Sequence, residues 1–342
     1  MRKFYAMLGV ISAAVAVLAI RGAGPLAAQA PSRELAPLQL IQRIPTPGVA
    51  GRIDHFTAYP KRRLLIFAAL GNNTVEVVNT FEAKVVHSLK GLNEPQGVLY
   101  VPGLDKIFVA NAGSGSVNVF DGKTFVLRKS IPLGEESDTD NLRWDEASKR
   151  VFVGIVGGLA MIDAATETHV AKDLKGTGGH SESFQLEKKG SRVFVNVPDD
   201  DSVVNVIDRK TGELTKWGLN GVKANYPMAL DEDNRRLFVV TRRPPFVMVL
   251  DTDTGKEVAR VPVGGSCDDV YFDAERKRIY ALGGEGFISV VQQNDPDHYT
   301  LAANIPSAVG VRTGIFFGNS LYVGVPAAGL EPAQIWNYGV PE

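Results

Sequence analysis

"KIFVANAGSGSVNVFDGKT" (residues 106–124) and "RLFVVTRRPPFVMVLDTDTG" (residues 236–255) follow the same pattern. Each has an alternating apolar run, a turn of small residues or prolines, a second alternating run and an Asp-x-x-Thr turn. Alternation with a period of two predicts β-strands, and neither stretch shows a 3.6-residue period long enough for a helix. Each stretch therefore predicts two neighbouring strands of one small sheet.

The pattern occurs seven times along the chain of 342 residues, with the other copies at 63–80, 150–166, 192–212, 278–293 and 320–338. The first apolar residues of the copies recur every 42–44 residues, at Leu64, Ile107, Val151, Val193, Leu237, Ile279 and Leu321. A period of roughly 40–45 residues with four short strands is typical of a β-propeller blade. We therefore predict an all-β fold, a seven-bladed β-propeller that forms one domain over residues 31–342.

The two ends of the chain predict how the propeller closes. The seventh copy reaches Glu342 after only three predicted strands. The N-terminal stretch "LIQRIPTPG" (40–48) is similar to the predicted outer strands "LRKSIPLGE" (127–135) and "VARVPVGGS" (258–266). Pairing the ends would remove two open sheet edges. We therefore predict that the N-terminal strand completes the last blade.

Residues 1–30 have the layout of a secretory signal peptide: basic Arg2 and Lys3, an apolar run to Ile20, and small residues before Pro31. Cleavage after Ala28 or after Ala30 fits the pattern. The alternative is an uncleaved anchor, because the apolar run reaches the lower limit of a membrane span. With cleavage, we expect a periplasmic or secreted protein with no membrane span.

The amino-acid composition argues against several classes of function. A formal net charge of −1, with both signs interspersed, argues against nucleic-acid binding. The only cysteine, Cys267, allows no internal disulfide and is expected to be buried. Five scattered histidines and the absence of a C-x-x-C-H motif argue against a copper cluster or covalent haem. We expect a monomer with a small-molecule or protein ligand.

The two quoted repeats resemble those of the YVTN-type (YncE-like) propellers of exported bacterial proteins, which have WD40/YVTN-like repeats. The resemblance covers the mature chain and implies a propeller fold and export. It does not choose a function, because such propellers serve both as binding scaffolds and as enzyme frameworks.

The stretch "GGHSESFQLE" (178–187) groups a histidine, two serines and a glutamate, as a catalytic triad would need. It aligns with "TDNLRWD" (139–145), "NYPMALD" (225–231) and "CDDVYFD" (267–273), so it marks the start of an innermost strand instead. The positions predicted to be equivalent in the seven blades are Asp54, Gln96, Asp140, Glu182, Tyr226, Asp268 and Thr313. Propeller symmetry brings equivalent positions to one axis, so these residues predict an acidic funnel.

The predicted ligand-binding funnel comprises Asp54, His55, Gln96, Asp140, Asn141, His180, Glu182, Asn225, Asp268, Asp269 and Arg312, with Arg312 as its basic member. Oxygen donors for a metal come from Asp140, Asn141, Glu182 and Asp268, and such donors favour calcium or magnesium. Three interpretations stay open: a channel mouth of solvated polar residues, a site for a ligand or cation, and a catalytic site.

Two functions from different classes follow. The first is a binding scaffold that takes a small molecule or a protein through the funnel. The alternative is a metal-dependent hydrolase that resembles the gluconolactonase-type propellers, in which a divalent cation held by Glu, Asn and Asp polarises a lactone carbonyl. The full sequence pattern of those lactone-hydrolysing enzymes is absent from this chain.

Overall fold

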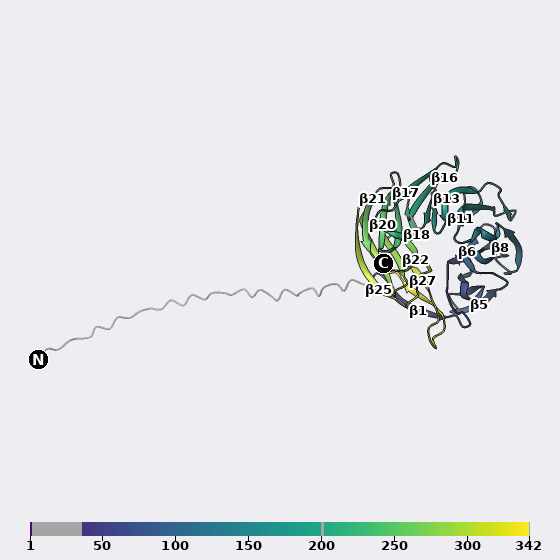
Figure 1. Ribbon diagram of the computed structural model, residues 1–342. Helices are drawn as coiled ribbons and strands as arrows, with labels where there is room; N and C mark the ends of the chain where they lie inside the picture. The colour runs from purple at the N-terminus through teal and green to yellow at the C-terminus, as the bar shows by residue number, and fades with distance from the viewer. Residues whose placement is uncertain (2–35, 200–201, 342) are drawn as a thin grey trace. The chain divides into compact units, whose positions relative to one another are not determined.

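The computed structural model describes Met1 and residues 36–199 and 202–341. Residues 36 onward form seven antiparallel sheets of four strands each, arranged in order around one axis (Figure 1). The predicted all-β, seven-bladed propeller is confirmed. Apart from Met1, the predicted signal peptide lies outside the described residues, so its cleavage stays a prediction.

The strands have the following bounds. Blade 1 contains β2 (Phe56–Tyr59), β3 (Leu64–Ala69), β4 (Thr74–Asn79) and β5 (Lys84–Leu89); blade 2 contains β6 (Pro95–Val101), β7 (Lys106–Asn111), β8 (Ser116–Asp121) and β9 (Leu127–Pro132). Blade 3 contains β10 (Leu142–Asp145), β11 (Arg150–Asp163), β12 (Thr168–His169) and β13 (Leu174–His180); blade 4 contains β14 (Phe184–Leu186), β15 (Arg192–Val197), β16 (Val203–Asp208) and β17 (Leu214–Gly218). Blade 5 contains β18 (Lys223–Asp231), β19 (Arg236–Arg243), β20 (Pro245–Asp251) and β21 (Glu257–Pro262); blade 6 contains β22 (Cys267–Asp273), β23 (Arg278–Gly283), β24 (Phe287–Asp295) and β25 (His298–Pro306). Blade 7 contains β26 (Gly314–Phe317), β27 (Ser320–Val325), β28 (Gln334–Gly339) and β1 (Gln39–Pro45). The 3-10 turns are η1 (Pro60–Arg62), η2 (Leu70–Asn72), η3 (Ala112–Ser114) and η4 (Glu135–Ser137).

The N-terminal strand closes the last blade, as predicted. Strand β1 pairs antiparallel with β28, and Ile44 lies opposite Ile335. Both isoleucines are fully buried in an apolar cluster that also contains Phe56 and Phe67 of blade 1. Apolar packing therefore continues from the last blade to the first, and the ring has no interrupted interface there.

In the innermost strand of blade 7, the register differs from the predicted one. The carbonyl of Thr313 accepts from Gly324 N just as the carbonyl of His55 accepts from Ala68 N, so Thr313 is equivalent to His55 rather than to Asp54. Arg312 therefore occupies the position of Asp54. The cause is Gly314, which pairs with Val323 where Leu142 pairs with Val153 in blade 3, so the apolar Ile315 lies one residue further along the strand.

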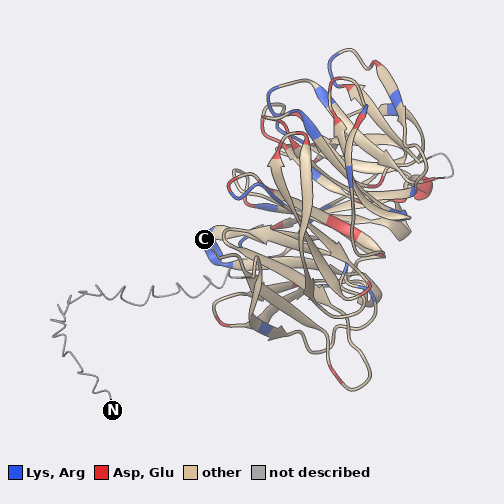
Figure 2. Ribbon diagram, turned by 90° about the vertical axis from the view of Figure 1, so that its left-hand side faces the viewer, with Lys and Arg blue, Asp and Glu red and all other residues tan. Residues whose placement is uncertain are grey.

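Charged residues of both signs lie together on the turns that connect the strands (Figure 2). The ion pair between Lys149 and Glu146, on the turn between β10 and β11, is an example. Within the described part of the chain, no helix has the length and apolar character needed to cross a membrane.

Cys267 is fully buried, as predicted, and its Sγ lies 3.2 Å from the Asp269 carbonyl oxygen. Burial raises the pKa of the thiol, so little reactive thiolate forms at neutral pH. We expect reducing agent to leave the melting temperature unchanged, since no second cysteine exists in the chain. Calorimetry with and without reductant checks this; a lower melting temperature in reductant would instead indicate a disulfide between two chains.

Candidate functional site

Four carboxylates meet where the innermost strands begin, and we call Asp54, Asp140, Glu182 and Asp268 the axial ring. The side chains of Asp54, Asp140 and Asp268 are no more than 7% exposed, and Glu182 is 19% exposed. Gly97 of β6 allows the close approach of blade 3, because a Cβ there would clash with the Asp140 carbonyl oxygen. The structure thus brings together the carboxylates that the repeat register had predicted.

His55 connects the axial ring to the next layer of residues. Its Nδ1 lies 3.2 Å from Asp269 Oδ1, and its Nε2 lies 3.6 Å from Asp140 Oδ1 and 3.1 Å from Asn141 Nδ2. Burial lowers the pKa of His55, but Asp269 and Asp54 outweigh burial and raise the pKa well above its ordinary value. The Asn141 amide, which donates towards Nε2, favours the neutral ring, so two opposing influences act on this imidazole.

Three arginines, rather than Arg312 alone, face the axial ring. Arg52 Nη2 lies 3.0 Å from Asp54 Oδ2 and 3.8 Å from Asp268 Oδ2. Arg242 donates from Nη2 to Asp268 Oδ1 and from Nε to the Cys267 carbonyl, at 2.9 Å for the latter. Arg312 Nη1 is more distant, at 3.9 Å from Asp268 Oδ2. The predicted acidic funnel is therefore a site of mixed charge.

Burial is the main cause of the raised carboxyl pKa values in the axial ring. It raises the pKa of Asp54, and together with the charge of Glu182 it raises the pKa of Asp140 well above its ordinary value. Burial also raises the pKa of Asp268 to about 6, with Arg242 acting in the opposite direction. Glu182 differs: its pKa is lowered, because hydrogen bonding to His180 outweighs burial. The ring therefore retains protons at a pH where exposed carboxyl groups have lost them.

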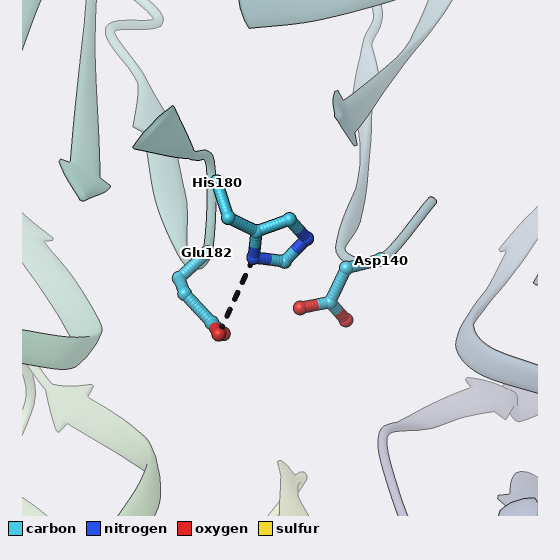
Figure 3. A group of neighbouring side chains, drawn as sticks. All are labelled: Asp140, His180 and Glu182. Atoms are coloured by element: carbon cyan, nitrogen blue, oxygen red, sulfur yellow. Dashed lines mark ion pairs between the residues drawn. The ribbon is translucent and has the colours of Figure 1, made fainter. Parts of the chain in front are cut away.

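Asp140, His180 and Glu182 form the group that could hold a metal ion (Figure 3). Each offers one ligand atom, and these atoms all lie within 4.8 Å of one another. His180 comes from the end of β13, while Asp140 and Glu182 precede β10 and β14, so neighbouring blades supply the ligands. Figure 3 shows the Asp140 carboxylate facing the other two side chains.

The predicted metal ligands overlap with this group only in Asp140 and Glu182. Asn141 Oδ1 accepts a hydrogen bond from Arg143 at 3.0 Å, and Asp268 Oδ1 accepts one from Arg242. Neither Asn141 nor Asp268 belongs to the group, which contains His180 instead.

Two carboxylate oxygens of the axial ring, Asp140 Oδ1 and Asp268 Oδ2, lack a hydrogen-bond partner among the described residues and lie at least 3.6 Å from any cationic nitrogen there. Both are buried. A buried polar atom without a partner is rare in proteins and costs about 1–3 kcal/mol. A proton, a water molecule or a ligand would satisfy these oxygens.

Two further residues of the predicted funnel lie outside this ring. Asn225 is fully buried and donates to Asn196 Oδ1 and to the Val203 carbonyl, both at 2.9 Å, so it ties blade 5 to blade 4 rather than facing a ligand. Gln96 contacts the exposed Asp138 at 3.4 Å. Both were predicted from the register, which gives a position along the strand but not the side-chain direction.

Beyond His55, Asn141 and Asp269 lies a cavity of about 360 Å³, which we call the channel chamber. All seven innermost strands line it. Its lining is mixed: Phe56, Leu142, Met228, Val270 and Ile315 supply apolar walls, and Arg143, Gln185 and Tyr271 are among its polar residues.

No family model and no curated protein matches this chain. Solved structures do match it. A chain of Kuenenia stuttgartiensis hydrazine synthase is 17% identical, covers 81% of this chain and 93% of its own, and has a TM-score of 0.71. The RRP9 WD40 repeats are 10% identical over 89% of this chain and 100% of their own, with a TM-score of 0.74. U3-55K is 9% identical over 88% of this chain and 98% of its own, with a TM-score of 0.75. At such identities the likeness concerns the fold alone: the chain is a seven-bladed β-propeller with WD40-like structural neighbours.

Proposed function

We propose that this protein is a noncatalytic binding module whose axial ring takes a divalent cation and, through it, an oxygen-rich ligand. The observation that carries the proposal is Asp140 Oδ1, which is buried, has no hydrogen-bond partner among the described residues, and belongs to a carboxylate that faces His180 and Glu182. A cation there would replace the missing partner and offset the repulsion between the two carboxylates.

The orientation of His180 supports a metal ligand. Its Nε2 lies 2.9 Å from the Asp138 carbonyl oxygen, to which it donates, and its Nδ1 lies 3.4 Å from Glu182 Oε1. A backbone carbonyl that holds one imidazole N–H directs the other nitrogen towards a metal, as in many histidine sites. The sequence-based candidates, calcium and magnesium, assumed oxygen donors only. One imidazole with two carboxylates instead favours zinc or manganese.

The metal-dependent hydrolase receives less support than the binding module. Its ligand set included Asn141 and Asp268, which lie outside the group of Asp140, His180 and Glu182 and accept from Arg143 and Arg242 through one oxygen each. On the repeats alone we further propose that the chain is a YVTN-type propeller that is exported to the periplasm or the exterior. Fractionation of cells that express the full chain, with mass determination of the mature N-terminus, would test the export.

Zinc or manganese is expected to raise the melting temperature by roughly 5 °C over protein in chelator, since a ligand at 100 times its dissociation constant adds about 2.7 kcal/mol of stability. Calcium and magnesium should have smaller effects. Scanning calorimetry with each ion, alongside a lactone and ester hydrolysis panel, checks the proposal and its alternative together.

The variants Asp140→Asn and Glu182→Gln should each abolish the shift. Asp295→Asn is the matched control, because Asp295 also contacts a histidine, His298, at 2.9 Å but lies on the surface. The same melting temperature with every ion and with chelator would contradict the cation site. A rise in melting temperature that persists in Asp140→Asn would contradict it as well. Metal-dependent lactone hydrolysis would instead favour the hydrolase.

A further inference from the structure

Most polar side chains of the channel chamber already have partners among the described residues. Tyr271 donates to the Gly314 carbonyl at 2.7 Å, and Gln185 Nε2 donates to the Met228 carbonyl at 2.8 Å. Asp269 accepts from Gly314 N at 3.0 Å through the oxygen that does not contact His55. These groups therefore have no strong need for a ligand.

Arg143 is different. Its Nη1 donates to Asn141 Oδ1 at 3.0 Å and to the Leu142 carbonyl at 2.9 Å. Among the described residues, Nε and Nη2 have no hydrogen-bond partner, and no carboxylate lies within 4.0 Å of the guanidinium. The guanidinium carbon lies 5.5 Å from the centre of the Phe184 ring. Arg143 is thus a cation whose Nε and Nη2 donors are free to bind a ligand.

The environment makes this free cation costly. Burial lowers the pKa of Arg143, which means that the surroundings disfavour its charge, yet an arginine stays protonated at any physiological pH. Arg143 is half-buried, and a charge held away from bulk water is normally offset by an opposite charge. The charges of Asp269 and Asp140 act on its pKa in the opposite direction to burial, but neither carboxylate forms an ion pair with the guanidinium among the described residues.

We propose that the channel chamber binds a small organic monocarboxylate. The free Nε–H and Nη2–H of Arg143 match the two oxygens of a carboxylate, a bidentate geometry that arginine favours. The apolar walls at Leu142, Met228 and Val270 would contact the body of the ligand. A single guanidinium fits one negative charge, and a cavity of about 360 Å³ lies within the usual range for small-molecule sites.

This site is independent of the cation site, because none of the three proposed metal ligands lines the chamber. Failure of one proposal therefore leaves the other standing. The chamber also differs from the predicted funnel in charge: it would select an anion, whereas the funnel was expected to attract a cation.

The test is calorimetric titration of the full chain, in chelator, with benzoate, phenylacetate and hexanoate, each paired with its neutral amide. We expect at least one carboxylate to bind, with its amide about tenfold or more weaker, since a hydrogen bond to a charged group is worth more than a neutral one. This comparison needs no variant. If no carboxylate binds at about 10 mM, a concentration that would reveal even millimolar affinity, or if the amides bind equally well, the proposal is wrong.

Variants locate the site. Arg143→Gln should weaken carboxylate binding at least about tenfold. Arg143→Lys should weaken it less, because lysine keeps the positive charge but lacks the two parallel N–H donors of the guanidinium. Arg260→Gln is the control, since Arg260 lies on the outer strand β21 and pairs with Glu257. A folded Arg143→Gln protein with unchanged affinity would place the carboxylate elsewhere and overturn the assignment.

Discussion

Deletion of residues 31–48 is expected to leave the protein insoluble, or to lower its free energy of unfolding by more than about 5 kcal/mol. The deletion removes β1 and with it the buried side chains of Leu38 and Ile44. It also exposes the edge of β28 and uncovers the apolar cluster between blades 7 and 1. Urea unfolding of the deletion protein beside the parent measures the loss.

Point variants on the same strand separate packing from chain length. Ile44 is fully buried, and Ile44→Ala should cost about 2–5 kcal/mol. Ile41 lies three residues earlier on β1 and is 61% exposed, so Ile41→Ala should change stability little. A soluble deletion protein with an unchanged unfolding midpoint would show that β1 does not close the ring.

The fold could be predicted because its information is local and repeated. Each blade is built from neighbouring segments of the chain, so the alternation in "KIFVANAGSGSVNVFDGKT" defines strands β7 and β8 without knowledge of the rest. The closure could also be predicted, since the stretch 40–48 resembles outer strands elsewhere. Strand β1 pairs with β28 as that similarity required.

The register of blade 7 could not be predicted in the same way. In the other innermost strands an apolar residue follows the ring position by two, as Phe56 follows Asp54 and Leu142 follows Asp140. Blade 7 has Gly314 at that place, and the next apolar residue, Ile315, suggests a register one residue later. Thr313 was therefore assigned to the position that Arg312 occupies.

The charge balance of the site depends on contacts between blades, which the repeat pattern does not contain. Arg52 precedes Asp54 by two residues, and an extended chain places both on one side, so this pair had a local signal. Arg242 belongs to the end of β19 in blade 5 and contacts Asp268 of blade 6. The length and direction of its side chain decide that contact. The repeat pattern therefore predicts a cluster of carboxylates, and the cations that balance them are found only in the structure.

The stability of the protein is expected to depend on pH through Asp268 in a direction opposite to that of most aspartates. Burial raises the pKa of this carboxyl to about 6 from an ordinary value of 3.8. Between these two pH values the native state keeps a proton that the unfolded state has lost, so raising the pH favours unfolding. The contribution of the protonated group is complete below about pH 4 and is lost as the pH rises through about 6.

Asp268→Asn tests this directly, because asparagine has the same shape as the protonated acid but does not titrate. The rise from 3.8 to about 6 corresponds to about 3 kcal/mol over the whole titration, so the stability of the parent relative to Asp268→Asn should fall by about 2 kcal/mol from pH 4 to pH 7. Urea unfolding of both proteins at each pH measures the difference. Asp295→Asn is the control of opposite sign, since hydrogen bonds to the Asp297 backbone and to His298 lower the pKa of the exposed Asp295. The free energy of unfolding of the parent minus that of Asp268→Asn could instead stay constant or increase with pH. That result would mean that Arg242 and Arg52 compensate the buried charge fully. Asp268 would then have no unsatisfied charge with which to bind a ligand.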